Sequence, residues 1–445
     1  MINPHLKSFG NTLIVGVGPA GIHAAVDWSK HSNQVGLLNR KGIRANQIQQ
    51  ELEQNEYAIY ADLQTPQARH LSSGTTVSCF YNGYEDVEDI WHTLVLCTPS
   101  DSYTQVIQQL NLAAMMRLRT IVLISPGIGS NLLLQRALGQ HAASIELISF
   151  STYYASSRFP FHENTMLKTV VKGMKRKIIV GTNRKDSKIT PILKAMLEAQ
   201  TIQCELAATP IEAESRSITT YVHPPFFMNE YSLNEIFGSH ISRKYLYKLY
   251  PEGPINQHTI RSMILLWKEI SELLLCFGVK PLNLLKFLND DNYPVHEVTL
   301  SRADIEGFPQ MEPIQQQYML YIRYSSILID PFSEPDEQGK YVDFSAIPYK
   351  QAEVDNNGHW YIPRIPYEDY KKLKLLCSLG QLLGVQMKHA LALVELFEDK
   401  LATFIEEKGA DRFAFDMMTD DTEEQAATIL LTFREQEAEA CLDTT

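Results

Sequence analysis

The sequence predicts an α/β protein with a doubly wound parallel sheet in its N-terminal half and a second, mostly helical domain in its C-terminal half. Two observations support this prediction. Short β-branched runs alternate with amphipathic helical patterns up to about residue 210, and helical patterns dominate from there to the C-terminus. Strand–helix alternation is typical of parallel sheets with right-handed crossovers. We therefore expect two domains, residues 1–210 and residues 211–445.

Five apolar runs are predicted as the parallel strands of the first domain, and the stretches between them have helical periodicity. The runs are residues 12–18, 34–40, 93–99, 120–126 and 145–152. A further strand, helix and strand are expected within residues 175–206, where the alternating pattern ends.

Helices are expected in the second half at residues 261–278, 280–290, 369–384 and 389–409. In the first of these, Met263, Trp267, Ile270, Leu274 and Phe277 share one face, and Gly278 is a candidate C-cap. Pro281 is expected near the first turn of the second. The Pro-, Tyr- and Asp-rich stretch 329–366 is predicted as irregular structure or a hairpin.

Composition excludes several classes of protein. The chain has 445 residues, 44% of them hydrophobic, and a formal net charge of −12, which argues against nucleic-acid or anionic-membrane binding. Its start lacks the features of a secretory signal, and no apolar run reaches the ~20 residues that span a bilayer. The six cysteines are scattered without a C-x-x-C pair. These features predict a reduced, cytoplasmic protein without a zinc site.

A glycine-rich turn follows the first predicted strand and begins a helix. In GVGPAG, Gly16 permits the tight turn, Gly18 lets the backbone approach a pyrophosphate, and Gly21 lets the helix pack close to the strand. Pro19 and Ala20 complete this loop. The free N–H groups at the helix N-terminus attract phosphate oxygens. The alternative is a glycine-rich turn that binds nothing, but the strand–turn–helix context favours dinucleotide binding.

The end of the second strand indicates which dinucleotide binds. A site specific for NAD normally places an acidic residue there to accept from the ribose 2′-OH. This chain has Asn39, Arg40, Lys41 and Arg44 instead, with no acid. Guanidinium and ammonium groups attract the 2′-phosphate of NADPH. A solvated basic loop is the alternative, and we predict NADPH.

Two later loops are expected near the nicotinamide, because they lie at the ends of the predicted strands 93–99 and 120–126. Thr98 and Pro99 lie in the first loop, and Ser125 and Pro126 lie in the second. Ordinary turn chemistry explains these residues equally well.

A histidine followed by two prolines is the strongest candidate for acid–base chemistry. His223 precedes Pro224 and Pro225, which we expect to stiffen the chain and to push His223 out of helical geometry. Most histidines in a protein are structural, so this observation alone does not assign a role.

The chain resembles the opine dehydrogenases of bacterial nicotianamine-like metallophore biosynthesis, the family that makes staphylopine and pseudopaline. The resemblance extends over about residues 11–400. It rests on the segments VGVGPAG, LISFSTYYASSR, YVHPPFFMN, YKLYPEGPI, NYPV and YIRYSSILIDPFSEPDEQGKYVDFSAIP.

The resemblance implies an activity. Such an enzyme condenses the amine of a histidine–aminobutyrate intermediate with an α-keto acid, pyruvate or 2-oxoglutarate, and reduces the imine with NADPH. The product is an opine-type metallophore, so the metal belongs to the product and not to the enzyme. A homodimer is also expected, with the helix near 263–277 as one candidate interface and the protein's own core as the alternative use of that face.

The resemblance also implies roles for single residues. Arg40 matches an arginine that the family keeps for the 2′-phosphate, and His223 falls in the YVHPP motif as the acid/base. More distant relatives pair this histidine with an aspartate, which makes Asp330 a candidate, although Asp330 could equally cap a turn before the proline that follows it. Arg323 is a candidate anchor for a substrate carboxylate, with a structural ion pair as the favoured alternative.

Tyr153 and Ser156 are the candidate substrate residues of the first domain, because they lie in the segment that resembles the family's substrate-side strand and loop. Ser156 stands where the staphylopine-making enzyme of the family carries an acidic residue. A small neutral side chain leaves room for a second carboxylate and makes 2-oxoglutarate sterically admissible, while pyruvate remains open.

Two other functions stay open on the residues alone. A dehydrogenase of the ketopantoate-reductase or glycerol-3-phosphate-dehydrogenase type would share this layout and act on a C=O bond, but it would normally offer a catalytic lysine. Lys268 is the lysine of the amphipathic helix within 211–290, and we expect it on the solvated face. A non-enzymatic NADPH sensor is the third alternative, and the presence of His223 argues against it.

Overall fold

The structure is a computed structural model that describes residues 8–64, 68–239, 242–329, 335, 338–341, 343, 347–355, 358–413 and 420–442. The chain divides into two compact units. Met1–Arg216 and Thr432–Thr445 make the first unit, and Ser217–Leu431 make the second.

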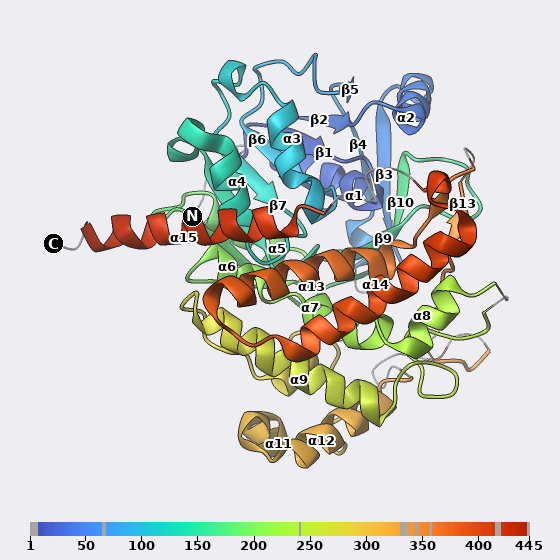
Figure 1. The fold of residues 1–445 in the computed structure, drawn as a ribbon. Coiled ribbons are helices and arrows are strands. Elements are labelled where there is room, and N and C mark those ends of the chain that lie inside the picture. The colour runs from blue at the N-terminus through green and yellow to red at the C-terminus, as the bar shows by residue number, and fades with distance from the viewer. Residues whose placement is uncertain are drawn as a thin grey trace. The chain divides into compact units, whose positions relative to one another are not determined.

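The first unit contains an eight-stranded sheet in the order β12-β11-β8-β7-β6-β1-β2-β5 (Figure 1). Every neighbouring pair is parallel except β8 and β11. The predicted fold class, a doubly wound α/β sheet followed by helices, is confirmed. The strands are β1 (Asn11–Val15), β2 (Gln34–Asn39), β5 (Phe80–Asn82), β6 (Thr93–Leu96), β7 (Thr120–Leu123), β8 (Glu146–Phe150), β11 (Lys177–Thr182) and β12 (Gln203–Leu206).

Alternating side chains of these strands build two cores, one on each face of the sheet. Ile14 of β1 belongs to one core, and its neighbours Leu13 and Val15 belong to the other. The first core also contains side chains of α1 (Pro19–Ser29) and α5 (Thr190–Glu198). The second contains side chains of α3 (Tyr103–Gln109) and α4 (Ser130–Leu138). A sheet buried on both faces accounts for strands that are almost continuously apolar.

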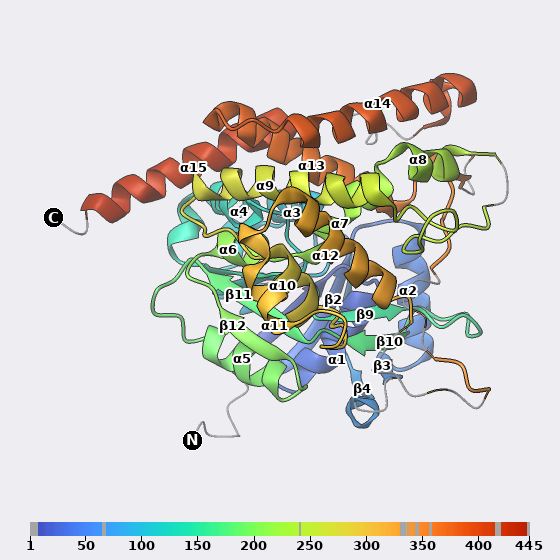
Figure 2. The same cartoon turned by 90° about the horizontal axis from the view of Figure 1, so that it is seen from below.

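A second, smaller sheet packs against α1 and was not predicted. It has the order β4-β3-β10-β9 and lies beside α1 in Figure 2. Its strands are β3 (Ala58–Leu63), β4 (Ser73–Thr76), β9 (Ala155–Arg158) and β10 (Lys168–Met174). Ile59, Leu63 and Val171 join the core that surrounds α1. One helix therefore lies between two sheets.

The helices of the second unit agree in place with most of the expected ones. They are α7 (Ile218–Phe227), α8 (Glu230–Phe237), α9 (Gln257–Leu275), α10 (Leu284–Asp290), α11 (Arg302–Gly307), α12 (Pro313–Ser326), α13 (Arg364–Leu383) and α14 (Lys388–Lys408). The long α15 (Thr422–Leu442) follows and runs into the first unit.

The buried face of α9, the start of α10 and the stretch 329–366 can each be compared with the sequence-based expectations. The predicted apolar face of α9 is buried, and Gly278 has a φ of +70°, as expected of a residue that ends a helix. Pro281 lies two residues before Asn283, the N-cap of α10, and so near the first turn of this helix. Within 329–366 the described part contains an antiparallel pair, β13 (Glu353–Val354) and β14 (Trp360–Tyr361).

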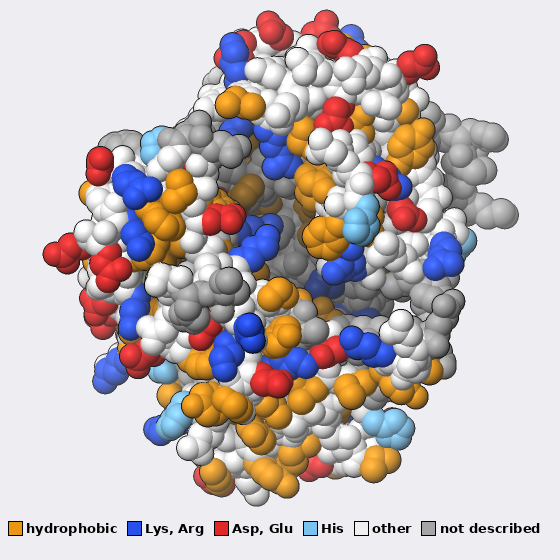
Figure 3. All heavy atoms as spheres, turned by 90° about the vertical axis from the view of Figure 1, so that its right-hand side faces the viewer, with side chains coloured by type: hydrophobic (Ala, Val, Ile, Leu, Met, Phe, Trp, Pro, Cys, Tyr) orange, Lys and Arg blue, Asp and Glu red, His pale blue; other side chains and the backbone are white. Residues whose placement is uncertain are grey.

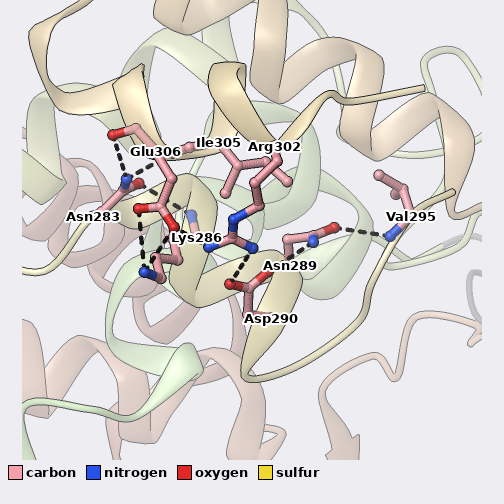
Figure 4. A network of polar contacts seen from close by, with 8 residues as sticks. All are labelled: Asn283, Lys286, Asn289, Asp290, Val295, Arg302, Ile305 and Glu306. Carbon is pink, nitrogen blue, oxygen red and sulfur yellow. Dashed lines mark hydrogen bonds and ion pairs between the residues drawn. The ribbon is translucent and has the colours of Figure 1, made fainter. Parts of the chain in front are cut away.

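A polar network joins α10 to α11 (Figure 4). Asn283 accepts from the N–H of Lys286 at 3.1 Å and donates to the carbonyl of Ile305 at 2.7 Å. Arg302 pairs with Asp290 at 2.8 Å in the same network. These ion pairs are exposed, so we expect each to stabilise the fold only slightly, and the N-cap contributes more.

The described surface shows no sign of a membrane span or a metal cluster. Among the described residues, no helix is long and apolar enough to cross a bilayer, and no group of three His, Cys, Asp or Glu is placed to hold a metal ion. On the face drawn in Figure 3, basic and acidic side chains are interspersed with apolar ones.

A completely buried carboxylate caps α4. Glu214, at the end of α6 (Pro210–Glu214), accepts from the N–H groups of Gly129 and Asn131 and from the hydroxyl of Ser149, each at 2.8 Å. Gly129 is the N-cap of α4 and has no side chain to serve this purpose. Burial nevertheless raises the pKa of Glu214 to about 8, although these hydrogen bonds lower it.

This pKa predicts a pH-dependent stability. Between about pH 5 and pH 8 the unfolded chain has lost the Glu214 proton and the folded chain has kept it, so the free energy of unfolding falls as pH rises. The slope approaches about 1.4 kcal/mol per pH unit. Glu214→Gln removes this slope, while lowering stability at every pH because its amide NH2 faces a donor.

Urea unfolding at pH 5.5, 6.5 and 7.5 measures the effect on the first unit. Glu53→Gln is the matched control, since Glu53 is exposed on α2 (Ile43–Gln54) and its replacement should leave the slope of the wild type unchanged. A wild type and a Glu214→Gln variant that lose stability in parallel over this range would contradict the prediction.

Candidate active site

The glycine turn after β1 has the geometry of a phosphate cradle. Gly16 has a φ of +98°, and a Cβ atom on Gly21 would lie 2.0 Å from the carbonyl oxygen of Gly16, so both positions require glycine. Gly18 is the N-cap of α1 and supplies no side-chain cap. A Cβ atom on Gly18 would meet no atom within 4 Å. The space before the helix N-terminus is therefore open, and a pyrophosphate fits it.

The end of β6 and the end of β2 both adjoin this turn. A Cβ atom on Gly16 would lie 2.8 Å from the Thr98 methyl carbon, and the Thr98 hydroxyl oxygen is buried without a hydrogen-bond partner in the described chain. Asn39 accepts from the N–H of Val17 at 3.2 Å. Thr98 and Asn39 thus both adjoin the glycine turn.

The remaining residues expected around a cofactor differ in their exposure. Arg40 and Lys41 are exposed and make no ion pair within the described residues, so both are available to a 2′-phosphate. Arg44 lies 5.4 Å from the ring centre of Phe159, as a cation–π contact. Pro99 is exposed and Pro126 is buried. These basic residues fit NADPH better than NADH, because no carboxylate stands at the end of β2.

An imidazole–carboxylate pair lies in the second unit. His223 of α7 places Nδ1 at 3.1 and 3.0 Å from the two carboxylate oxygens of Asp369, which belongs to α13. The two side chains are only 13% and 8% exposed. Because the carboxylate accepts from Nδ1–H, the neutral imidazole presents Nε2 as its proton acceptor.

The helical conformation of His223 corrects a sequence-based expectation. Pro224 and Pro225 were expected to force the preceding residue out of α geometry, yet both lie inside α7, which runs from Ile218 to Phe227. Tyr221, Phe226 and Phe227 are completely buried, and the packing of this face holds the short helix together despite the two missing N–H donors. Tertiary packing thus overrides the low helix propensity of the two prolines.

The free nitrogen of His223 faces aromatic side chains. The hydroxyl oxygen of Tyr247 lies 3.4 Å from Nε2, and the Phe227 ring packs edge-on at 4.8 Å between ring centres. Burial raises the pKa of Tyr247, so its hydroxyl keeps its proton. Among the contacts of the described residues, Nε2 thus faces one neutral hydroxyl, and an aromatic ring packs against the imidazole.

Sequence reasoning missed Asp369 and proposed Asp330 in its place. Asp330 lies outside the described residues. Asp369 stands in PYEDYKKL, near the start of α13, and it is 7% exposed while the neighbouring charges are not buried. The signal available in the sequence was an acid at a position where helical periodicity predicts the apolar face, and this signal is weak without a known partner.

Arg323 is buried and bound to backbone. Its Nη2 atom donates to the carbonyls of Leu288 and Tyr293 at 2.7 and 2.9 Å, and the side chain is 1% exposed. Burial lowers the pKa of this guanidinium. Within the described structure these hydrogen bonds go to backbone carbonyls at and just after the end of α10. They therefore give no support to either interpretation made from the sequence, the substrate anchor or the structural ion pair.

Tyr153 and Ser156 have different surroundings in the first unit. The hydroxyl of Tyr153 points inward and lies 2.7 Å from Nδ1 of His23 and 3.1 Å from the Ser157 hydroxyl. His23 belongs to α1, is completely buried and has a pKa lowered by burial. Ser156 is exposed on β9. The start of β9 is therefore fixed to the helix that follows the glycine turn.

The chain is similar to known proteins over most of its length. The staphylopine dehydrogenase family model matches residues 10–433. A pseudopaline synthase of Pseudomonas aeruginosa is 40% identical over 410 residues, which cover 91% of this chain and 93% of that protein. A staphylopine synthase of Staphylococcus aureus is 37% identical, with 84% and 87% covered.

Solved structures show the same relationship. A yersinopine dehydrogenase bound to NADP+ is similar to this chain with a TM-score of 0.88 and 33% identity, covering 96% of this chain and 99% of that one. An octopine dehydrogenase has a TM-score of 0.59 at 15% identity, with 88% of each chain covered, and shows a shared fold. The family resemblance seen in the sequence is confirmed. With its phosphate cradle and its imidazole–carboxylate pair, this chain belongs to the staphylopine dehydrogenase family.

Proposed function

We propose that this protein is an NADPH-dependent opine dehydrogenase that joins an amine to an α-keto acid and reduces the product to a secondary amine. The observation that carries the proposal is the His223–Asp369 pair, whose Nε2 is free of charged partners, in a member of this family. The amine nitrogen attacks the keto carbon, the carbinolamine loses water to give an imine, and the imine accepts a hydride and a proton.

The cofactor would be held by residues of the first unit. The N–H groups at the start of α1, opened by Gly18, would bind the pyrophosphate, and Arg40 and Lys41 would bind the 2′-phosphate. Thr98, whose buried hydroxyl lacks a partner, would line the site, and Pro99 and Pro126 are proposed beside it. When bound, NADPH supplies the hydride for the reduction.

His223 would move the protons of the condensation. Nε2 accepts a proton from the amine as it attacks, and the imidazolium donates this proton to the alkoxide oxygen to give the carbinolamine. A second proton, taken up from solvent, lets the hydroxyl leave as water and stays in the balance as the proton of the protonated imine, which then accepts the hydride. Asp369 faces Nδ1 and offsets the positive charge of the imidazolium, while it also fixes the orientation of the ring. The neutral hydroxyl of Tyr247 lies 3.4 Å from Nε2 and is its polar neighbour within the described residues.

The substrates are proposed from the relatives, which are named as synthases of pseudopaline and staphylopine. The amine would be a histidine–aminobutyrate intermediate, and the keto acid would be pyruvate or 2-oxoglutarate. The product would be an opine-type metallophore. Ser156 is small, neutral and exposed on β9, and it leaves room for the second carboxylate of 2-oxoglutarate.

The surroundings and assembly of the protein are also proposals. No disulfide joins the cysteines among the described residues, which supports a reducing, cytoplasmic location. A homodimer is proposed with the exposed side of α9 as its interface, because the apolar face first considered for an interface is buried in the core. On the exposed side, Leu265 and Leu275 are 37% and 57% exposed.

We also propose different roles for the two parts of the chain. The N-terminal part, about residues 1–210, binds the cofactor, and residues 211–445 supply the acid/base.

An assay with separated reactants tests the reaction. Oxidation of NADPH, followed by absorbance at ~340 nm as the reduced nicotinamide is consumed, is expected to require both the keto acid and aminobutyryl-histidine, and to be faster with NADPH than with NADH. Oxidation with the keto acid alone would contradict the proposal and favour a ketopantoate-reductase type of enzyme. Absence of oxidation with every pair of reactants would favour a sensor.

Substitution of the proposed acid/base tests its role. His223→Asn should lower kcat by about 10²- to 10⁴-fold, the usual contribution of general acid–base catalysis, with the Kd for NADPH unchanged. Asp369→Asn should lower kcat by about 10- to 100-fold, since a charged hydrogen bond to the imidazolium is lost. The control is His258→Asn, an exposed histidine at the start of α9. A wild-type kcat in the His223 variant would remove this residue from the mechanism.

Two alanine substitutions separate the cradle from the fold. A Cβ atom on Gly18 meets no protein atom, so Gly18→Ala should keep the wild-type Tm and raise the Kd for NADPH at least tenfold. A Cβ atom on Gly21 meets the Gly16 carbonyl, so Gly21→Ala should lower the Tm as well. Fluorescence titration and thermal unfolding measure both quantities. Unchanged NADPH affinity in a folded Gly18→Ala protein would place the phosphates elsewhere.

A further inference from the structure

Arg158 lies at the end of the strand that carries Ser156. It is the last residue of β9, it pairs in register with Val170 of β10, and its carbonyl accepts from the hydroxyl of Thr169. The backbone at this position is therefore fixed by the small sheet. A side chain that starts from a fixed backbone can be pre-organised for a ligand.

The guanidinium of Arg158 lacks hydrogen-bond partners. Its Nε and Nη1 atoms are buried, and neither has a partner in the described chain. No acid of the described chain pairs with it. Guanidinium stays charged at all physiological pH values, and leaving such N–H groups buried and unpaired is costly. A partner that the protein itself does not supply would remove this cost.

An exposed aromatic ring covers one face of the guanidinium. The carbon Cζ of Arg158 lies 3.7 Å from the ring centre of Phe161, and Phe161 is 79% exposed. This stacking holds the guanidinium plane and leaves its edge for hydrogen bonds.

The alternation of the strand places Arg158 on the same side as Ser156. Ser157 points to the α1 side, where its hydroxyl contacts Tyr153, so the residues on either side of it point to the other side. Ser156 is exposed there. One face of β9 thus offers a hydroxyl and a charged planar fork two residues apart.

The contrast with Arg323 distinguishes a structural arginine from a ligand-binding one. Arg323 is also buried, but its Nη2 atom makes two short hydrogen bonds to carbonyls. Arg158 makes no side-chain hydrogen bond that the described structure shows. Within the described chain Arg323 leaves Nε without a partner, whereas Arg158 leaves both Nε and Nη1.

We propose that Arg158, with Ser156 beside it, binds a carboxylate of the small-molecule substrate through two parallel N–H···O hydrogen bonds, one from Nη2 and the other from either Nε or Nη1, the two nitrogens that lack a partner in the described chain. A planar fork matches the two oxygens of a carboxylate. The phosphates of NADPH have their own cradle at Gly18 and their own cations, Arg40 and Lys41, so they do not need this residue. The inference rests on the proposed opine dehydrogenase activity, and the carboxylate belongs either to the keto acid or to the amine.

Steady-state kinetics of Arg158→Gln test the proposal. Loss of a bidentate charged contact should raise the KM of the bound reactant by about 10- to 100-fold, while the Kd for NADPH stays unchanged. Pyruvate, 2-oxoglutarate and aminobutyryl-histidine are varied in turn. A KM raised for 2-oxoglutarate alone identifies its distal carboxylate, a KM raised for both keto acids identifies the carboxylate they share, and a KM raised for the amine identifies that reactant. Each of these results supports the site.

Two further variants keep the test decisive. Arg158→Lys preserves the charge without the fork and should recover only part of the affinity. Lys172→Gln removes a positive charge from the exposed side of β10 and should leave every KM unchanged. An Arg158→Gln protein with wild-type KM values for all three reactants, or with a changed Kd for NADPH instead, overturns the proposal. Wild-type protein that turns over no reactant pair would overturn the function itself, which is a different result.

Discussion

The close approach of α1 to β1 is the constraint on which the rest of the first unit depends. The main chain at Gly21 passes so near the carbonyl of Gly16 that a Cβ atom would lie 2.0 Å from its oxygen. The strand can therefore turn into a helix within a few residues, and the helix N-terminus points into open space before Gly18. The positive end of the helix dipole and its unpaired N–H groups then face the position of a pyrophosphate.

The same helix organises what would surround the substrate. Side chains of α1 share a core with the large sheet and with the small one, and His23 reaches Tyr153 at 2.7 Å. Through this contact β9 is fixed by the helix that would bind the phosphates. A buried histidine with a lowered pKa stays neutral, so the link is a hydrogen bond without a charge. The helix that would bind the phosphates thus also holds β9, the strand that would face the substrate.

The sequence predicted those parts of the fold that depend on local pattern. The parallel strands, the glycine turn and α9 follow from periodicity and from the needs of single residues such as Gly16. The small sheet did not follow, because its short strands are separated in the chain and its pairing of β3 with β10 joins distant segments. The helical state of His223 was missed for a similar reason, since long-range packing of Phe226 and Phe227 overrides the two prolines.

The candidate site was predictable only where one residue suffices. The glycines and the acid-free loop are local features of the sequence that indicate a dinucleotide site, and the family resemblance indicated His223. Asp369 has meaning only next to its partner, 146 positions away in the chain. Arg158 is an ordinary arginine in the sequence, and only the structure shows that two of its nitrogens are buried and unpaired. A pairing between distant residues, or a missing hydrogen-bond partner, arises from tertiary structure and leaves no local pattern in the sequence.

Two buried carboxylates show how surroundings decide the use of one chemical group. Glu214 accepts only from neutral donors, two backbone N–H groups and a hydroxyl, so burial dominates and raises its pKa to about 8. It can hold α4 in place, but no partner near it gains or loses a charge. Asp369 faces an imidazole, whose positive charge appears when Nε2 takes up a proton. Only the second arrangement couples a buried acid to proton transfer, because the pair becomes neutral overall at the moment the substrate is deprotonated.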